Sequence, residues 1–278
     1  MKYFKFFPSK QLEPFIECYF IWQSDSGPVK DFVVESPPNG FCSIVFNCGD
    51  NYYLHNKKYE KLLVPSSFIS GQAIYSYKLF LNGHISMAGI VFKPAGLASL
   101  FDLPVYEFTE ERIALGNIFR ESIVSETAGS LKQVLAPAEK AKHLEAFVLK
   151  MIENKLPSPD AIDEAANKIV EKNGLLHVSE LIEQAYMSRR NFERKFFKKV
   201  GLSPKYYARI RRMSYIGNLI AGKTKVDWPS VFHNCEYYDQ SHFIKDFIEF
   251  TGRTPQQYFE ENRELSRYVE KPVGRPLD

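Results

Sequence analysis

A repeat near the C-terminal end is the feature that most constrains how this chain can fold. The segment 188–196 aligns with 239–247 at an offset of 51 residues. Further pairs match at the same offset: Leu181 with Phe232, Tyr186 with Tyr237, Phe192 with Phe243, Phe196 with Phe247, Pro204 with Pro255 and Tyr207 with Tyr258. So many matches at one offset indicate a structural unit that occurs twice.

Each copy of the repeat predicts a helix, a tight turn and a second helix. Ser188 and Asp239 stand where a side-chain oxygen caps the start of the second helix. The two phenylalanines that follow each cap lie four residues apart, so they share one buried face. Met187 and Tyr238, just before the caps, are expected to pack onto the first of these phenylalanines. The predicted first helices cover 178–185 and 228–235, and Ser203-Pro204 and Thr254-Pro255 predict the start of a further helix in each copy.

Positive charge is concentrated in the first copy. Residues 188–225 contain twelve Lys or Arg and one Glu, a net charge of +11, whereas the whole 278-residue chain carries only +3. Such a local concentration of cations is typical of a surface that binds nucleic acid.

The N-terminal half favours β-structure followed by helices. Apolar runs at 41–46, 75–80 and 85–92 predict strands, and Asn82-Gly83 between two of them predicts a hairpin. A short helix is expected at 94–101. Apolar residues then recur at helical spacing from about 117 onward, and a further helix is expected at 159–172.

These patterns predict an α+β chain of 278 residues in two main parts. The first part is a β-rich sheet or barrel with helices 117–155 packed behind it, and the second is an all-α domain of two helix-turn-helix lobes. The expected boundaries are 1–155 for the N-terminal domain, 156–174 for a linker or connecting helix, 175–262 for the DNA-binding domain and 263–278 for a tail.

Several classes of protein find no support in the sequence. No nucleophile-elbow, phosphate-loop or zinc-protease motif is present, and the four cysteines show no paired metal-ligand spacing. We therefore expect no enzymatic activity, no catalytic residues, no metal and no cofactor. The start of the chain lacks a secretory signal and no apolar run is long enough to span a membrane, which favours a reduced, cytoplasmic protein.

The strings 187–196 and 241–258, with their Phe-x-x-x-Phe, Gly-x-Thr-Pro and Tyr, carry a family resemblance. Residues 175–260 resemble the DNA-binding domain of the AraC/XylS family of bacterial transcription activators. The resemblance implies that a long linker helix over 204–221 joins the two lobes and that the β-rich N-terminal domain is sensor-like. It also implies sequence-specific binding of double-stranded DNA, with two recognition helices in successive major grooves about 34 Å apart. It also implies a contact with RNA polymerase and a role in transcription regulation, more often as an activator.

The outward faces of the two predicted recognition helices supply the candidate site residues. Arginine bonds guanine in a bidentate manner, glutamate accepts from cytosine, and shorter polar side chains read bases less strongly. The expected base contacts are Arg189, Arg190, Glu193 and Arg194 in the first helix and Gln240, Ser241 and Lys245 in the second. The expected phosphate contacts are Ser188, Lys198, Lys199 and His242. For both helices the alternative is contact with the DNA backbone only, and the unusual turn at Cys235-Glu236 leaves the aim of the second helix open.

The N-terminal half resembles a poorly characterised domain found in some relatives, and its role is left open. Its aromatic residues either line a pocket for a small-molecule effector or fill the core; the candidates are Trp22, Tyr75, Tyr77 and Phe92. In better-known relatives the helices behind the sheet mediate dimerisation, so a homodimer is a further expectation. The alternatives are a DNA-binding architectural or co-regulatory factor without a ligand, and a fusion with an enzymatic N-terminal domain.

Overall fold

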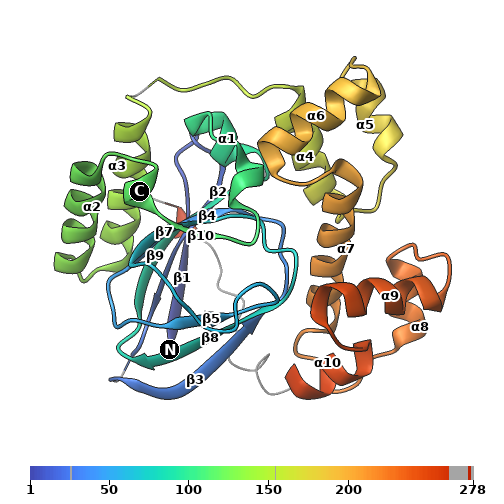
Figure 1. The fold of residues 1–278 in the computed structure, drawn as a ribbon, viewed down its shortest axis with the longest axis horizontal. Coiled ribbons are helices and arrows are strands. Elements are labelled where there is room, and N and C mark those ends of the chain that lie inside the picture. Colours follow the sequence, from blue (N-terminus) through green and yellow to red (C-terminus); the bar gives the residue numbers. More distant parts are fainter. Residues whose placement is uncertain (26, 154, 263–274, 277–278) are drawn as a thin grey trace.

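The computed structural model describes residues 1–25, 27–153, 155–262 and 275–276, and it divides into a β-rich N-terminal half and a helical C-terminal part (Figure 1). The expected fold class is confirmed. The tail predicted at 263–278 lies outside the described residues except for 275–276. Among the described helices, none has the length and apolar character needed to cross a membrane.

Two sheets form the N-terminal half. The larger has the order β10-β7-β4-β9-β2-β1-β11, with β1 at Lys2–Phe7, β2 at Ile16–Gln23, β4 at Ser43–Asn47, β7 at Ser67–Ser70, β9 at Ser86–Phe92, β10 at Arg112–Ala114 and β11 at Arg275–Pro276. The smaller has the order β3-β8-β5-β6, with β3 at Val29–Ser36, β5 at Tyr53–His55, β6 at Leu62–Leu63 and β8 at Tyr77–Gly83. Val45 and Met87 of the larger sheet and Leu54 and Leu81 of the smaller sheet are buried in one cluster. The two sheets therefore pack face to face.

The hairpin predicted at Asn82-Gly83 is wrong. β8 pairs with β3 and β5 in the smaller sheet, whereas β9 pairs with β2 and β4 in the larger one. The Asn82 side chain accepts from the Asp31 backbone N–H, and Gly83 has a φ of +83°. The turn residues therefore mark the corner where the chain crosses between the sheets, because a left-handed glycine serves a corner as well as a hairpin.

Helices cover the outer face of the larger sheet, as expected (Figure 1). They are α1 at Gly96–Phe101, α2 at Glu121–Gln133 and α3 at Pro137–Met151, together with two short 3-10 segments, η1 at Val105–Phe108 and η2 at Leu115–Asn117. Leu144 and Phe147 of α3 are buried in one cluster with Ile21 of β2 and Ile90 of β9. The N-terminal domain thus has a core on each face of its larger sheet.

In the described residues 155–262 the C-terminal part has seven helices: α4 at Ala161–Glu171, α5 at Val178–Gln184, α6 at Arg189–Val200, α7 at Pro204–Ile220, α8 at Trp228–Asn234, α9 at Gln240–Thr251 and α10 at Pro255–Asn262. We call α4–α6 the first lobe and α8–α10 the second lobe; α7 joins them. Ile162 and Ile169 of α4 are fully buried in the same core as α5–α9. The segment expected as a linker or connecting helix, 156–174, contains a helix that contributes to the C-terminal core.

The predicted helix signals act as expected in both lobes. The Ser188 side chain accepts from the Asn191 backbone N–H at 3.4 Å, and Asp239 accepts from the His242 N–H at 2.8 Å. Gly201 and Gly252 end α6 and α9 with φ values of +89° and +74°. The four phenylalanines that match across the repeat are buried: Phe192, Phe196, Phe243 and Phe247. Local capping and core formation are thus repeated from one lobe to the other.

The turn between the paired helices differs from the prediction. Upstream of the caps the repeat offset is 50 residues, since buried Leu181 occupies the place of buried Val231. The second turn is one residue longer, and the Tyr237 ring contacts Phe243 at 5.3 Å. The packing expected of Tyr238 is wrong because its side chain is 96% exposed. At the offset of 50, Tyr237 is the counterpart of Met187 and packs against the same core, whereas Tyr238 is the extra residue of the longer turn.

Candidate nucleic-acid interface

The second helix of each helix-turn-helix unit, α6 or α9, has its N-terminal end directed away from the N-terminal domain (Figure 1). At the C-terminal end of α6 the Thr109 hydroxyl donates to the Gly201 carbonyl at 3.3 Å. At the C-terminal end of α9 the Ser76 N–H donates to the Phe250 carbonyl at 2.9 Å. Both helices are therefore anchored at one end and free at the other, which is where recognition helices present side chains to base edges.

The free end of α6 is basic. Arg190, Arg194 and Lys195 are exposed, and within the described part of the chain none of them has a carboxylate partner. Arg194 donates to the Asn191 side-chain oxygen at 3.1 Å. Lys195 was not among the site residues predicted from the sequence. Its exposure could have been predicted, because on a helix it lies off the face that carries the buried phenylalanines. Three unneutralised cations thus face solvent at the free end.

Arg189 and Glu193 form a pair of their own. Their side chains bridge one helical turn, with the Arg189 Nε 3.0 Å from the Glu193 carboxylate and both groups exposed. An exposed i,i+4 pair of this kind contributes only about 0.3–0.5 kcal/mol. The pair orients two side chains that are expected to read bases, and its ion pair is weak enough to break when either side chain contacts a base.

Lys199, expected as a phosphate contact, has other partners. Its ammonium lies 2.7 Å from the Asp163 carboxylate and 2.9 Å from Asp160, and it donates to the Ser99 hydroxyl at 3.0 Å. Asp163 is 2% exposed. Lys198 is exposed and lies 3.4 Å from exposed Asp102 of the N-terminal domain. Lys199 is therefore a structural cation between the two domains.

Three cations of α7 are also held by the protein. Arg209 lies 2.7 Å from the Asp246 carboxylate and also pairs with Glu249, so it ties α7 to α9. Arg211 is buried, donates to the Asn39 backbone carbonyl and lies over the Phe41 ring. The Arg212 guanidinium lies over the Tyr237 ring. The free positive charge of the segment is thus smaller than its sequence count and is concentrated on α6.

The second lobe presents a different surface. Gln240, Ser241 and Lys245 are exposed on α9, together with 42% of Ile248. Residues 226–262 carry two basic and seven acidic side chains, a net charge of −5. The cap Asp239 has its pKa lowered from its ordinary value, because the backbone N–H of His242 donates to it. Its carboxylate charge persists at neutral pH, next to the His242 ring at 3.3 Å.

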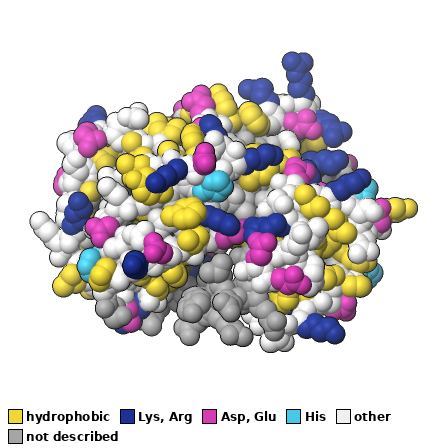
Figure 2. All heavy atoms as spheres, turned by 60° about the horizontal axis from the view of Figure 1, so that its bottom comes forward, with side chains coloured by type: hydrophobic (Ala, Val, Ile, Leu, Met, Phe, Trp, Pro, Cys, Tyr) yellow, Lys and Arg dark blue, Asp and Glu magenta, His cyan; other side chains and the backbone are white. Residues whose placement is uncertain are grey.

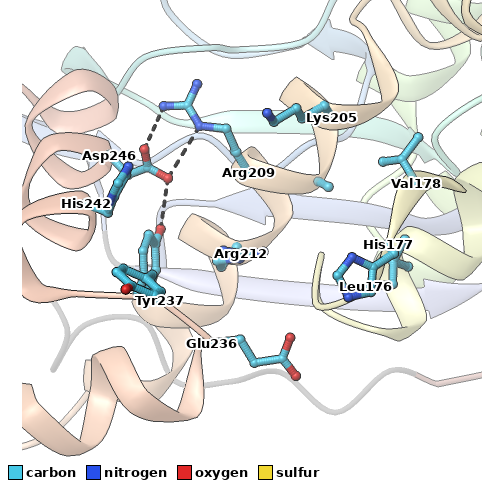
Figure 3. A pocket seen from close by; sticks show the side chains of 12 residues that line it. Leu176, His177, Val178, Lys205, Arg209, Arg212, Glu236, Tyr237, His242 and Asp246 are labelled. Atoms are coloured by element: carbon cyan, nitrogen blue, oxygen red, sulfur yellow. Dashed lines mark hydrogen bonds and ion pairs between the residues drawn. The ribbon is translucent and has the colours of Figure 1, made fainter.

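A groove of about 610 Å³ lies between the lobes, along α7 (Figure 3). Lys205 and Arg212 of α7 line it together with His177 and His242, and Glu236 and Asp246 are its acidic residues. Asp246 is occupied by Arg209 and by the Tyr237 hydroxyl at 3.1 Å. In Figure 2 Lys and Arg side chains gather on the side that holds the C-terminal domain. Lys205 in this groove is therefore a further cation, beside those of α6, that can contact an anion.

The aromatic residues expected to line an effector pocket are divided between two cores. Phe92 is fully buried in the core under the helices and packs edge-on against Phe101. Trp22 and Tyr77 are half-buried against the core between the sheets. Tyr75 lies beneath the Lys57 ammonium, which is 4.2 Å from its ring centre. Phe92 at least serves packing, since no part of its side chain is accessible.

Comparison with known families fits this geometry. Residues 181–261 match a helix-turn-helix domain family, and residues 4–114 match a domain family of unknown function. Residues 181–261 form an AraC-type helix-turn-helix domain. The chain is a DNA-binding transcription regulator. Among curated proteins, none matches it in sequence.

Solved structures of AraC-like regulators match the chain at low sequence identity. ToxT from Vibrio cholerae is 12% identical, with 86% of this chain and 95% of that one covered and a TM-score of 0.44. A structure of ToxT with a bound unsaturated fatty acid is 13% identical, covers 85% and 96%, and has a TM-score of 0.42. The AraC-like activator CuxR is 11% identical, covers 83% and 99%, and has a TM-score of 0.27. The identification itself depends on the C-terminal AraC-type domain.

Proposed function

We propose that this regulator binds specific duplex sequences mainly through α6. The observation that carries the proposal is the free, basic end of this helix, where Arg190 and Arg194 are exposed and pair with no carboxylate of the described residues. Either arginine can donate two hydrogen bonds to one guanine. Glu193, released from Arg189, is placed to accept from cytosine. Base reading by the first lobe then supplies most of the specificity.

The second lobe is proposed as the weaker reader. Gln240, Ser241 and Lys245 are the exposed candidates on α9, and only Lys245 is positively charged. The lobe as a whole repels DNA, because residues 226–262 carry a net charge of −5. Its contribution is therefore to fix the register of the protein on the DNA rather than to add affinity.

Phosphate contacts are proposed around the groove between the lobes. When α6 and α9 occupy successive major grooves, this groove lies over the DNA backbone between them. Lys205 and His242 line it, and Ser188 and Lys198 lie on α6 or at its cap. Lys199 is not among these contacts, because Asp160 and Asp163 hold its ammonium. Lys205→Gln should lower the slope of log K against log salt by about one.

The direction of regulation and its input are further proposals. We infer activation and a polymerase contact from the AraC-type domain, and a small-molecule effector or a homodimer from the presence of a separate N-terminal domain. Of the four proposed pocket residues, Trp22, Tyr75 and Tyr77 retain some exposure. A thermal-shift screen of metabolites on Trp22→Ala and wild-type protein tests the effector, and sedimentation with and without DNA tests the dimer.

Selection of bound duplexes from a random library tests the central proposal. We expect one enriched motif with two halves whose centres lie about 10–10.5 base pairs apart, the first half more strongly conserved than the second. A library that stays unenriched would contradict sequence-specific binding and leave a ligand-free architectural role. Genomic footprinting of the same protein, with a transcriptional readout, then separates an activator from a repressor.

A further inference from the structure

The N-terminal domain holds the first lobe through an apolar and a polar contact. Tyr106 of η1 stacks on Phe197 of α6 with ring centres 5.2 Å apart. The Tyr207 hydroxyl of α7 donates to the Gly40 carbonyl at 2.7 Å, a bond that is buried on both sides. At Gly40 a Cβ atom would stand 2.6 Å from the Arg211 side chain, so the loop lies directly against α7. These contacts leave the first lobe little freedom to move relative to the sheets.

The same domain holds the second lobe through its smaller sheet. Glu35 of β3 pairs with Arg253, which lies just after α9, and the Glu35 carboxylate is 4% exposed. Beside it, the N–H of Ser76, the residue before β8, donates to Phe250 at the end of α9. β3 and β8 are neighbouring strands in which Glu35 stands opposite Lys78. One rigid sheet edge therefore contacts the second lobe with two adjacent anchors.

A second polar connection joins the second lobe to α7. Arg209 of α7 reaches Asp246 and Glu249 of α9, and the Tyr206 hydroxyl donates to Glu249 at 2.8 Å. These groups are partly exposed, so water and salt weaken the Arg209 pairs. The Glu35–Arg253 pair is the more buried of the two connections. The N-terminal domain and α7 thus both hold the second lobe at a fixed angle to the first.

We propose that the N-terminal domain sets the spacing between the two DNA half-sites, and that Glu35 is the positioning residue for the second lobe. The inference rests on the proposed function, in which both lobes contact one duplex. A change of one base pair moves a half-site by about 3.4 Å along the axis and about 34° around it. A second lobe that is attached both to α7 and to the smaller sheet cannot follow that displacement. A lobe released from the sheet can rotate about α7.

The test uses the full-length protein and operators whose two half-sites are separated by the selected spacing or by one or two base pairs more or fewer. Glu35→Gln removes the carboxylate charge and keeps the shape of the side chain. Asp102→Asn is the matched control, because it also removes one negative charge of the N-terminal domain that pairs with a lysine of the C-terminal part, Lys198, at an exposed site. Glu35→Asp is a second variant that keeps the charge and withdraws it by one methylene.

We expect wild-type protein and Asp102→Asn to prefer the selected spacing over a one-base-pair change by roughly tenfold. Glu35→Gln and Glu35→Asp should lower this preference to about threefold or less, with affinity for the first half-site alone unchanged. Circular dichroism checks that both variants are folded, and Glu35→Asp alone carries the comparison if Glu35→Gln is not.

An unchanged spacing preference in a folded Glu35 variant would overturn the inference and assign the angle to α7 and α9 alone. Wild-type protein that binds a single half-site at every spacing would overturn it as well. Neither result touches the proposed reading of bases by α6. Failure of the proposed function is a separate outcome, in which no sequence, single or paired, binds better than random DNA.

Discussion

The first and second lobes of the AraC-type domain bury the same kind of residues and expose different ones. Phe192 and Phe196 of α6 and their counterparts Phe243 and Phe247 of α9 are all buried. In total charge, residues 188–225 carry +11 and residues 226–262 carry −5. A duplicated fold therefore does not imply a duplicated function, because the core residues that maintain the fold are not those that meet the DNA.

The largest effect should be the same in both lobes. Phe196→Ala and Phe247→Ala each empty a fully buried ring site, since both side chains are 0% exposed. We expect each to lower the free energy of unfolding by about 3–5 kcal/mol. Denaturant titration followed by circular dichroism measures this loss. A loss below about 1 kcal/mol in only one lobe would show that the two cores are not equivalent.

The ion pairs of Lys199 with Asp160 and Asp163 distinguish the first lobe from the second. Lys199→Ala leaves the Asp163 carboxylate, which is 2% exposed, without its cation. We expect a loss of about 3 kcal/mol, the usual result of removing one partner of a buried pair. The matched variant at the DNA face, Lys195→Ala, should change stability by less than about 0.5 kcal/mol. Equal losses in the two variants would contradict the structural role.

The same cluster predicts an acid-sensitive contribution to stability. Burial alone would raise the pKa of Asp160, but hydrogen bonds from Lys199 and Asp163 and the Lys199 charge lower it below its ordinary value. A lowered folded-state pKa gives stability that is present above the unfolded pKa of about 3.9 and is lost as the pH falls through the folded value. Thermal melts of wild type and Asp160→Asn should therefore converge below about pH 4.

DNA affinity should distinguish the lobes at equivalent positions of the repeat. Arg194 of α6 and Lys245 of α9 match at the offset of 51 residues. We expect Arg194→Ala to cost about 1–3 kcal/mol, unevenly across operator variants, because a bidentate base contact is lost. Lys245→Ala should cost less than about 1 kcal/mol. Gel-shift titrations at one salt concentration measure both, and equal costs would contradict the assignment of the first lobe as the main reader.

The smallest effects are expected at two exposed tyrosines. Tyr186 in the first turn and Tyr238 in the second are both 96% exposed. Tyr186→Ala and Tyr238→Ala should each change the free energy of unfolding by less than about 0.5 kcal/mol. Tyr237→Ala, one residue earlier in the second turn, should cost more, since its ring packs on Phe243 and its hydroxyl donates to Asp246. Equal stability of Tyr237→Ala and Tyr238→Ala in a thermal melt would remove the distinction.

The sequence by itself determined the local features of both lobes. Caps at Ser188 and Asp239, stops at Gly201 and Gly252 and the buried phenylalanines were all predictable, because each depends on residues within a few positions along the chain. The fold class and the arrangement of helices behind the sheet followed from periodicity in the same way.

Only the tertiary structure decided how charges and chain crossings are used. Twelve cations in one segment look alike in sequence, but Lys199 meets Asp163, Arg209 meets Asp246, and Arg190 meets no carboxylate among the described residues. Asn82-Gly83 has the same local chemistry in a hairpin and at a corner between sheets. Such outcomes depend on partners more than thirty residues away along the chain or on which strands pair, and no local pattern specifies these contacts.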